Sequence, residues 1–239
     1  MDFTQYRKQE LYEKLCQSGL TPLDLLIVGQ TGGGKTSTIN TLFNRNVGKV
    51  GYGVDPETME ITPYRLNDYI RIWDSPGFGD GADNDKSYKK AIKKLLKKEV
   101  TVKGNSYGLI DLVLVVLDSS SRDLNTAFYV IRKILKHIEP ERVLVVVNQA
   151  DFSMKGRNWD ETNNKPNSIL LNHLREQAEA FKRRIYESTG LEILLPVFYS
   201  AKLNYNIEKV FDLIIDNIPK CHREKSRNSN FNLAFNFFN

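Results

Sequence analysis

The sequence has few cysteines and no long hydrophobic run. Cys16 and Cys221 are the two cysteines among 239 residues, and no C-x-x-C or Cys/His spacing accompanies them. This usage predicts a reduced, cytoplasmic protein without a zinc site. No apolar run approaches the roughly 20 residues that span a bilayer, and the first residues do not read as a signal peptide. We therefore expect no transmembrane segment, while a peripheral membrane association stays open.

The chain has only a small excess of positive charge. The formal net charge is +5, which suits an anionic ligand or surface but identifies none. A hydrophobic content of 41% supports a sizeable core, and the length suits one large domain. We expect residues 1–20 to form a helix packed on that domain, residues 21–218 to form the domain, and residues 219–239 to form a basic, then Phe/Asn-rich tail. Such a tail is either a weak membrane or partner anchor, or a segment that is disordered or packs locally.

Strand-like and helix-like patterns alternate after the first helix. The runs 112–117 and 143–147 are continuously apolar, as in strands buried on both faces of a parallel sheet. Segment 61–73 fits a hairpin with Asn67-Asp68 as its turn. We therefore predict a three-layer α/β fold, with a mostly parallel sheet, one antiparallel edge strand and helices on both faces. The expected strands are 24–28, 61–66, 69–73, 111–117, 142–147 and 193–198, and the expected helices are 4–18, 36–44, 86–99, 124–138, 168–188 and 206–217.

A glycine-rich motif is the most informative stretch of the chain. Residues 29–37 read Gly-Gln-Thr-Gly-Gly-Gly-Lys-Thr-Ser between an apolar run and an expected helix, which satisfies the phosphate-binding loop pattern in full. Backbone N–H groups and the helix dipole favour phosphate there. We expect Lys35 to reach the β- and γ-phosphates and the Thr36 hydroxyl to bind Mg²⁺. The expected nucleotide contacts in this loop are Gly29, Thr31, Gly32, Gly33, Gly34, Lys35, Thr36 and Ser37.

Two later signals fit the metal and the γ-phosphate. Thr58, in the loop before the second strand, is expected to bind Mg²⁺ and sense the γ-phosphate, with Thr62 as the alternative. Asp74 begins an Asp-Ser-Pro-Gly motif at the end of a strand and would hold Mg²⁺ through water, while the Gly77 amide would contact the γ-phosphate. Taken alone, either motif is also a common loop or turn. The expected metal residues are Thr36, Thr58 and Asp74, and the expected catalytic residues are Lys35, Thr58 and Gly77.

Two further signals fit a guanine base. Guanine presents N–H donors at N1 and at its 2-amino group, and the Asp151 carboxylate can accept from both, whereas adenine has no such donor pair. Asn148 is expected to fix its loop and read N7 or O6. The Ala201 amide can reach O6, and the stem of Lys202 can cover the ring. The expected base contacts are Asn148, Asp151, Ser200, Ala201 and Lys202.

These motifs, in this order from Gly29 to Lys202, resemble those of GTPases of the translation-factor-like class, which have the P-loop NTPase fold. Within that class the chain resembles the Era/TrmE–septin branch and is most similar to bacterial single-domain YfjP-type (Era-like) proteins, through segments 53–58, 73–81 and 148–151. The resemblance implies a GTP-binding domain over 21–218. It also implies binding of GTP and GDP with Mg²⁺, hydrolysis of GTP to GDP and phosphate, and a switch that acts on an effector protein.

Three residues depart from the pattern of that class. Gln149 replaces the usual lysine, so we expect weaker nucleotide affinity. Phe78 replaces the glutamine that orients the attacking water in Ras-like enzymes, and Gly32 replaces the asparagine of potassium-activated relatives. We therefore predict slow intrinsic hydrolysis, completed by a partner or by a homodimer across the nucleotide face. The alternative is a septin-like scaffold that assembles with GTP and barely turns over.

A lysine-rich helix follows the Asp-Ser-Pro-Gly motif. It is either a solvated helix face or a basic patch for RNA, anionic lipid or an acidic protein. Trp159, in the polar segment 152–167, is either part of an interaction surface or a capping aromatic residue. The lysines of this region are Lys86, Lys89, Lys90, Lys93, Lys94, Lys97, Lys98 and Lys103.

Overall fold

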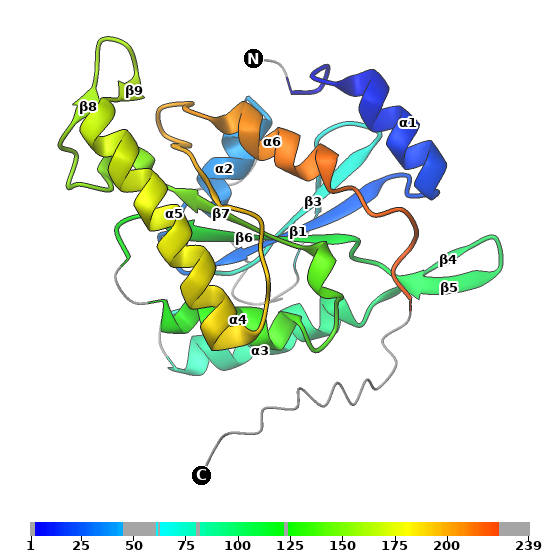
Figure 1. The fold of residues 1–239 in the computed structure, drawn as a ribbon. Coiled ribbons are helices and arrows are strands. Elements are labelled where there is room, and N and C mark those ends of the chain that lie inside the picture. Colours follow the sequence, from blue (N-terminus) through cyan, green and yellow to red (C-terminus); the bar gives the residue numbers. More distant parts are fainter. Residues whose placement is uncertain (1–2, 45–60, 62, 80–81, 122–123, 225–239) are drawn as a thin grey trace.

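The computed structural model describes residues 3–44, 61, 63–79, 82–121 and 124–224, with the backbone alone for 82–84. Figure 1 draws the remaining residues as a thin grey trace. Thr58 and its alternative Thr62 therefore lie outside the described residues.

A six-stranded sheet forms the centre of the molecule (Figure 1). Its strand order is β10-β7-β6-β1-β3-β2, and every neighbouring pair is parallel except β2 and β3, which are antiparallel. The predicted α/β fold, with one antiparallel edge strand, is confirmed. The strands are β1 (Leu23–Gly29), β2 (Pro63–Arg65), β3 (Ile70–Asp74), β6 (Leu112–Asp118), β7 (Val143–Asn148) and β10 (Val197–Phe198).

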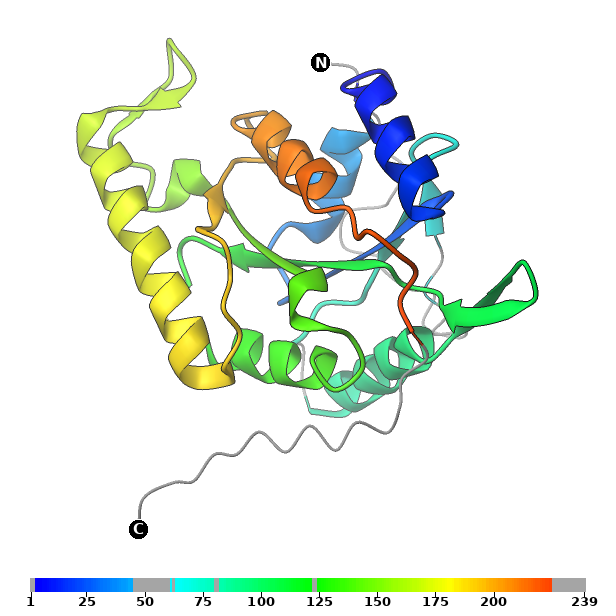
Figure 2. The same ribbon diagram turned by 45° about the vertical axis from the view of Figure 1, so that its right-hand side comes forward.

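Helices cover both faces of this sheet, which gives the three layers. The helices α1 (Lys8–Ser18), α2 (Lys35–Leu42) and α6 (Ile207–Asp216) contribute to one buried cluster. The other cluster receives side chains from α3 (Ala82–Leu96), α4 (Asn125–Ile134) and α5 (Ser168–Thr189). Figures 1 and 2 show the same division from two directions.

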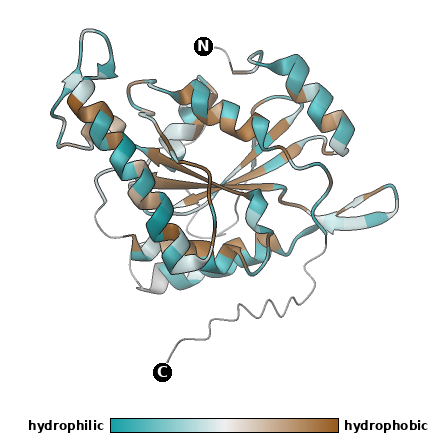
Figure 3. Cartoon of the chain, viewed as in Figure 1, coloured by the Kyte–Doolittle hydropathy of each residue, from teal (hydrophilic) through white to brown (hydrophobic). Residues whose placement is uncertain are grey.

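Strand alternation divides the core between the two faces. In β1, Leu25 and Ile27 join the cluster with α1, whereas Leu26 and Val28 join the cluster with α3, because successive side chains of a strand point to opposite faces. The central strands are therefore predominantly apolar, as Figure 3 shows. This confirms the interpretation of the continuous apolar runs as doubly covered strands.

Two hairpins lie outside the sheet. The expected helix 86–99 ends at Leu96 instead, and β4 (Glu99–Val102) pairs with β5 (Asn105–Gly108) in a hairpin that projects from the body (Figures 1 and 2). Lys103 and Gly104 connect them with φ of 51° and 81°, the conformation of a two-residue hairpin turn. Lys98 and Lys103 therefore lie outside the helix.

The polar segment 152–167 also contains a short hairpin. Its strands are β8 (Trp159–Asp160) and β9 (Lys165–Pro166). The Trp159 ring packs edge-on against Tyr205 with 5.1 Å between ring centroids, so this tryptophan caps the end of the core. A further difference concerns the last expected strand, 193–198, which pairs only over Val197–Phe198.

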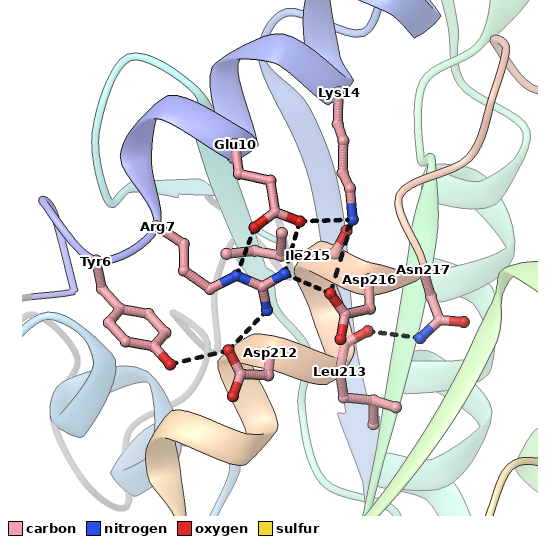
Figure 4. A network of polar contacts seen from close by, with 9 residues as sticks. All are labelled: Tyr6, Arg7, Glu10, Lys14, Asp212, Leu213, Ile215, Asp216 and Asn217. Carbon is pink, nitrogen blue, oxygen red and sulfur yellow. Dashed lines mark hydrogen bonds and ion pairs between the residues drawn. The ribbon is translucent and has the colours of Figure 1, made fainter.

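A charged cluster holds α1 against α6 (Figure 4). The Arg7 guanidinium lies 2.7 Å from Asp212 and 2.5 Å from Asp216, and it also pairs with Glu10 at 2.7 Å. Hydrogen bonds from Arg7 lower the pKa of Glu10 to about 2. Leu11 and Leu15 are buried beneath these ion pairs, so α1 is attached by both apolar and charged contacts.

Arg223 fixes the last described segment to the body. Its guanidinium donates hydrogen bonds to the carbonyl oxygens of Ile110, His137 and Leu96, at 2.9, 2.8 and 2.7 Å. The side chain is only 1% exposed, although the sequence places it in a basic tail. Residues 225–239 lie outside the described part of the chain.

Among the described residues, none of the helices is both long and apolar enough to cross a membrane.

Candidate functional site

Four of the five predicted motifs meet at one edge of the sheet, and the fifth, at Thr58, lies outside the described residues. Strands β1, β3, β6, β7 and β10 run parallel, so their carboxyl ends share that edge. In open α/β sheets, ligands bind at this edge. The phosphate-loop pattern follows β1, the Asp-Ser-Pro-Gly motif begins at the end of β3, and the segments at Asn148 and Ser200 follow β7 and β10.

Glycines let three of these loops touch. Gly34 has φ of 88°, and a Cβ atom added there would lie 2.0 Å from Nδ2 of Asn148. A Cβ atom on Gly77 would lie 2.5 Å from Cα of Thr31. Gly32 has φ of 77° and open space around it. The phosphate loop is therefore in contact with the loop after β3 and with the loop after β7.

Lys35 begins α2 with its side chain buried. It is 7% exposed, and its ammonium donates a 3.0 Å hydrogen bond to the carbonyl oxygen of Gln30. Burial lowers the pKa of Lys35 to about 8, although the nearby Asp74 carboxylate opposes the shift. A buried cation without an ion pair among the described residues is favourable for binding an anion at this point.

Thr36 and Asp74 form a pair of oxygen ligands. The Thr36 hydroxyl donates a 2.9 Å hydrogen bond to Oδ2 of Asp74. The other oxygen, Oδ1, is buried and has no hydrogen-bond partner among the described residues. Burial raises the pKa of Asp74 to about 6. Hydroxyl and carboxylate oxygens are ligands that Mg²⁺ accepts, and the buried, unpartnered Oδ1 fits a cation at this place.

Few other groups could hold the metal. Within the described ranges, no three His, Cys, Asp or Glu side chains gather as a metal site. A magnesium ion here would therefore depend on Thr36, Asp74, water and ligand oxygens, because Mg²⁺ usually keeps waters and phosphates in its coordination shell.

Asn148 connects the phosphate loop to the loop after β10. It is 3% exposed; its Nδ2 donates to the Gly33 carbonyl at 3.1 Å, and its Oδ1 accepts from the Ala201 amide at 3.0 Å. This is the loop-fixing role expected from the sequence. Both polar groups of the side chain, and the Ala201 amide, make protein contacts here, so their expected contacts to a base stay predictions.

Gln149 and Ser119 make hydrogen bonds at the site that the sequence does not predict. Nε2 of Gln149 donates a 3.0 Å hydrogen bond to the Gly32 carbonyl. The Ser119 hydroxyl donates to the Gln149 carbonyl at 2.6 Å, and its amide donates to the Asn148 carbonyl at 3.0 Å. The position of Ser119 directly after the apolar strand β6 was the available signal.

Asp151 presents a carboxylate that no described residue binds. It lies in a short 3-10 turn, Ala150–Phe152, and is half-buried. Ser200 is buried and accepts a 3.2 Å hydrogen bond from the Leu203 amide, whereas Lys202 is exposed. Asp151 therefore keeps its acceptor oxygens available at the edge where the other predicted residues meet.

Tyr199 makes a buried contact with α2 that the sequence does not predict. Its hydroxyl lies 2.7 Å from the Thr38 hydroxyl, and the ring is fully buried. Burial raises the pKa of this phenol, so it remains a neutral hydrogen-bonding group. The contact fixes α2 to the loop that contains Ser200.

Phe78 has its backbone at the site and its ring in the core. The Thr31 amide donates to the Phe78 carbonyl at 2.8 Å, and the Phe78 amide donates to the Gly29 carbonyl at 3.2 Å. The ring is 4% exposed and belongs to the cluster with α3 and α4. A buried apolar ring offers no polar atom to a water molecule.

Comparisons with known proteins agree with this geometry. A model of the 50S ribosome-binding GTPase family matches residues 24–173. The probable GTP-binding protein EngB of Streptococcus uberis is 26% identical over 197 residues, 82% of this chain and 85% of that protein. Uncharacterized protein YkfA of Escherichia coli K12 is 26% identical over 153 residues, 63% of this chain. The crystal structure of Toc33 from Arabidopsis thaliana with GDP and Mg²⁺ has a TM-score of 0.54 at 19% identity, covering 90% of this chain and 91% of that one.

The extent of these matches differs among the relatives. The chain spans 49% of the length of YkfA but 85% of EngB. The family match covers more than half of the chain and includes the phosphate loop, Asp74, Asn148 and Asp151. The chain therefore belongs to the 50S ribosome-binding GTPase family.

Proposed function

We propose that this chain binds GTP and GDP with Mg²⁺, hydrolyses GTP slowly and acts as a nucleotide switch. The observation that carries the proposal is the double hydrogen bond of Asn148 to Gly33 and Ala201. It brings the phosphate loop and the expected base-binding loops into one site. Asp151, with its free acceptors, supports guanine over adenine.

The phosphate end of the site supports phosphoryl transfer to water. Lys35 would place its charge on the β- and γ-phosphates, and Thr36 and Asp74 would hold Mg²⁺. A bound magnesium ion supplies stabilisation of the charge that develops on the phosphate oxygens. Thr58 is proposed to sense the γ-phosphate, and the Gly77 amide is proposed to contact it.

The rate is proposed to be slow because the position after Gly77 offers no side chain to orient water. The Phe78 ring is buried in the core. A missing glutamine or arginine finger is worth about 10³–10⁵ in rate. A partner protein or a second copy across the nucleotide face would then complete the site.

We also propose a branch of the family for this chain. The motifs at 53–58, 73–81 and 148–151 favour the Era/TrmE–septin branch and YfjP-type proteins within the family. A reduced cytoplasmic setting follows from the cysteine usage. The alternative function is a GTP-dependent assembly scaffold with little turnover, and the buried Phe78 ring favours it as much as it favours slow hydrolysis.

Turnover of GTP with Mg²⁺, measured across a series of protein concentrations with ATP alongside, tests the proposal. Turnover per molecule that rises with concentration supports a hydrolase completed by self-association. Tight GTP binding with a flat, very slow rate, and a size that grows with GTP by light scattering, supports the scaffold. A preference for ATP would overturn the interpretation of Asn148 and Asp151.

A further inference from the structure

A groove lies between α3 and α4, on the face of the sheet away from α2. Both views place these two helices side by side (Figures 1 and 2). The groove has a volume of about 470 Å³. Lysines line it from both helices and from the turn after α4: Lys89, Lys90, Lys93, Lys97, Lys133 and Lys136.

The positive charge of this groove is uncompensated. No carboxylate is among its described lining residues, and none of the six lysines pairs with a described carboxylate. The ammonium groups of Lys89 and Lys133 instead lie 4.4 and 5.1 Å from the ring centre of Tyr129. Clefts with walls of one charge sign focus the electrostatic potential and attract the opposite charge.

Burial and nearby positive charges together lower the pKa of His137, which lines the same groove. Burial, followed by Lys97, Lys93, Arg223 and Lys136, lowers the pKa of His137. The lowered pKa is a second sign that positive charge is crowded along this groove.

The floor of the groove is apolar. It is formed by Phe78, Ile92, Leu96, Val130 and Ile134. A nucleic-acid backbone has no apolar side chains for such a floor, and a flat bilayer surface does not enter a concave groove. An acidic segment with one apolar face matches both the charged rims and the floor.

We propose that this groove binds an acidic amphipathic segment of a partner protein. Apolar side chains of the segment lie on the floor, and its carboxylates meet the lysines of the two rims. The surface is separate from the nucleotide site, so the inference does not require GTP hydrolysis. It is joined to that site through Phe78, whose backbone pairs with Gly29 and Thr31.

The test uses the full chain and a fluorescent synthetic helical peptide with glutamates on one face and leucines on the other. Fluorescence anisotropy measures its binding. Lys93→Glu with Lys133→Glu changes one lysine on each helix, and we expect affinity to fall about tenfold, because two favourable charge pairs with the peptide become repulsive. The matched control, Lys94→Glu with Lys165→Glu, makes the same charge change at exposed lysines outside the groove and should stay within about twofold of wild type.

Milder changes keep the test informative if the charge reversals impair folding. Lys97→Gln with Lys136→Gln removes two exposed charges that line the groove. These changes should lower the affinity for the peptide by about threefold. Equal losses in the groove and control variants would overturn the proposal, because non-specific attraction would then explain binding. Tighter groove-dependent binding of a scrambled peptide, of poly(A) RNA or of anionic phospholipid vesicles would overturn it as well.

Discussion

The Thr36 hydroxyl donates a 2.9 Å hydrogen bond to Oδ2 of Asp74, although 38 residues separate the two in sequence. Thr36 lies in the first turn of α2, and Asp74 is the last residue of β3. Oδ1 of Asp74 stays buried without a hydrogen-bond partner among the described residues. We therefore propose this pair as the protein's oxygen ligands for Mg²⁺.

Asp74→Asn is expected to weaken the dependence of GDP binding on Mg²⁺. An amide loses the negative charge but keeps the shape, so magnesium affinity should fall about 10–100-fold. Titration of Mg²⁺ against a fluorescent GDP analogue measures the effect. Asp68→Asn, at an exposed carboxylate of the hairpin turn, is the control. Equal magnesium dependence in Asp74→Asn and wild type would contradict the assignment of Asp74 to the metal.

Gly34→Ala is expected to impair nucleotide binding far more than Gly32→Ala. Both glycines have positive φ, at 88° and 77°, so both substitutions carry a similar backbone strain of about 1–2 kcal/mol. Only at Gly34 would the new Cβ atom collide with Asn148, at 2.0 Å from Nδ2. Binding of the GDP analogue by the two variants separates strain from collision. Similar losses at both positions would show that the Asn148 contact does not matter.

Gln149→Ala is expected to weaken GDP binding by about 2–10-fold. The substitution removes the hydrogen bond to the Gly32 carbonyl, and such a neutral bond contributes about 0.5–1.5 kcal/mol. Gln149→Lys should bind GDP more tightly than wild type, because an ammonium donates a stronger, charge-assisted bond to the same carbonyl. Dissociation rates of the fluorescent analogue measure both variants. A lysine variant no better than alanine would be the contradictory result.

Asp111 makes stability depend on pH at a place remote from the nucleotide motifs. Its Oδ2 accepts a 2.9 Å hydrogen bond from the Asp24 amide. Burial raises the pKa of Asp111 to about 7; the hydrogen bond from the Asp24 amide and the charges of Arg142 and Arg223 oppose the shift, and the Asp24 carboxylate adds to it. A carboxyl with a raised folded pKa favours its protonated form, so its contribution to stability is present below about pH 4 and lost as pH rises through about 7.

Asp111→Asn should therefore be more stable than wild type at pH 8, by about 1–3 kcal/mol, and this advantage should be clearly smaller at pH 5. Urea unfolding at the two pH values measures the difference between variant and wild type. The titration of other groups cancels in that difference. A constant difference at both pH values would mean that the charge of Asp111 is not its source.

The sequence by itself determined the central strands of the sheet, and it predicted the candidate site residues. The apolar runs of β6 and β7, and the contiguous phosphate loop with Lys35 and Thr36, are local signals, because strand burial and a phosphate loop are both encoded over a few neighbouring residues. The β4–β5 hairpin is not evident from the sequence, because lysines continue from the helix to the hairpin turn at Lys103 and Gly104.

Only the tertiary structure decided which groups meet. Asn148 between Gly33 and Ala201, Tyr199 against Thr38, and Arg223 among three carbonyl oxygens join residues that lie far apart in the chain. The same holds for the groove, where lysines of α3 and α4 face one apolar floor. Hydrogen bonds and electrostatic interactions depend on distance in space, and the packing of helices on the sheet sets that distance.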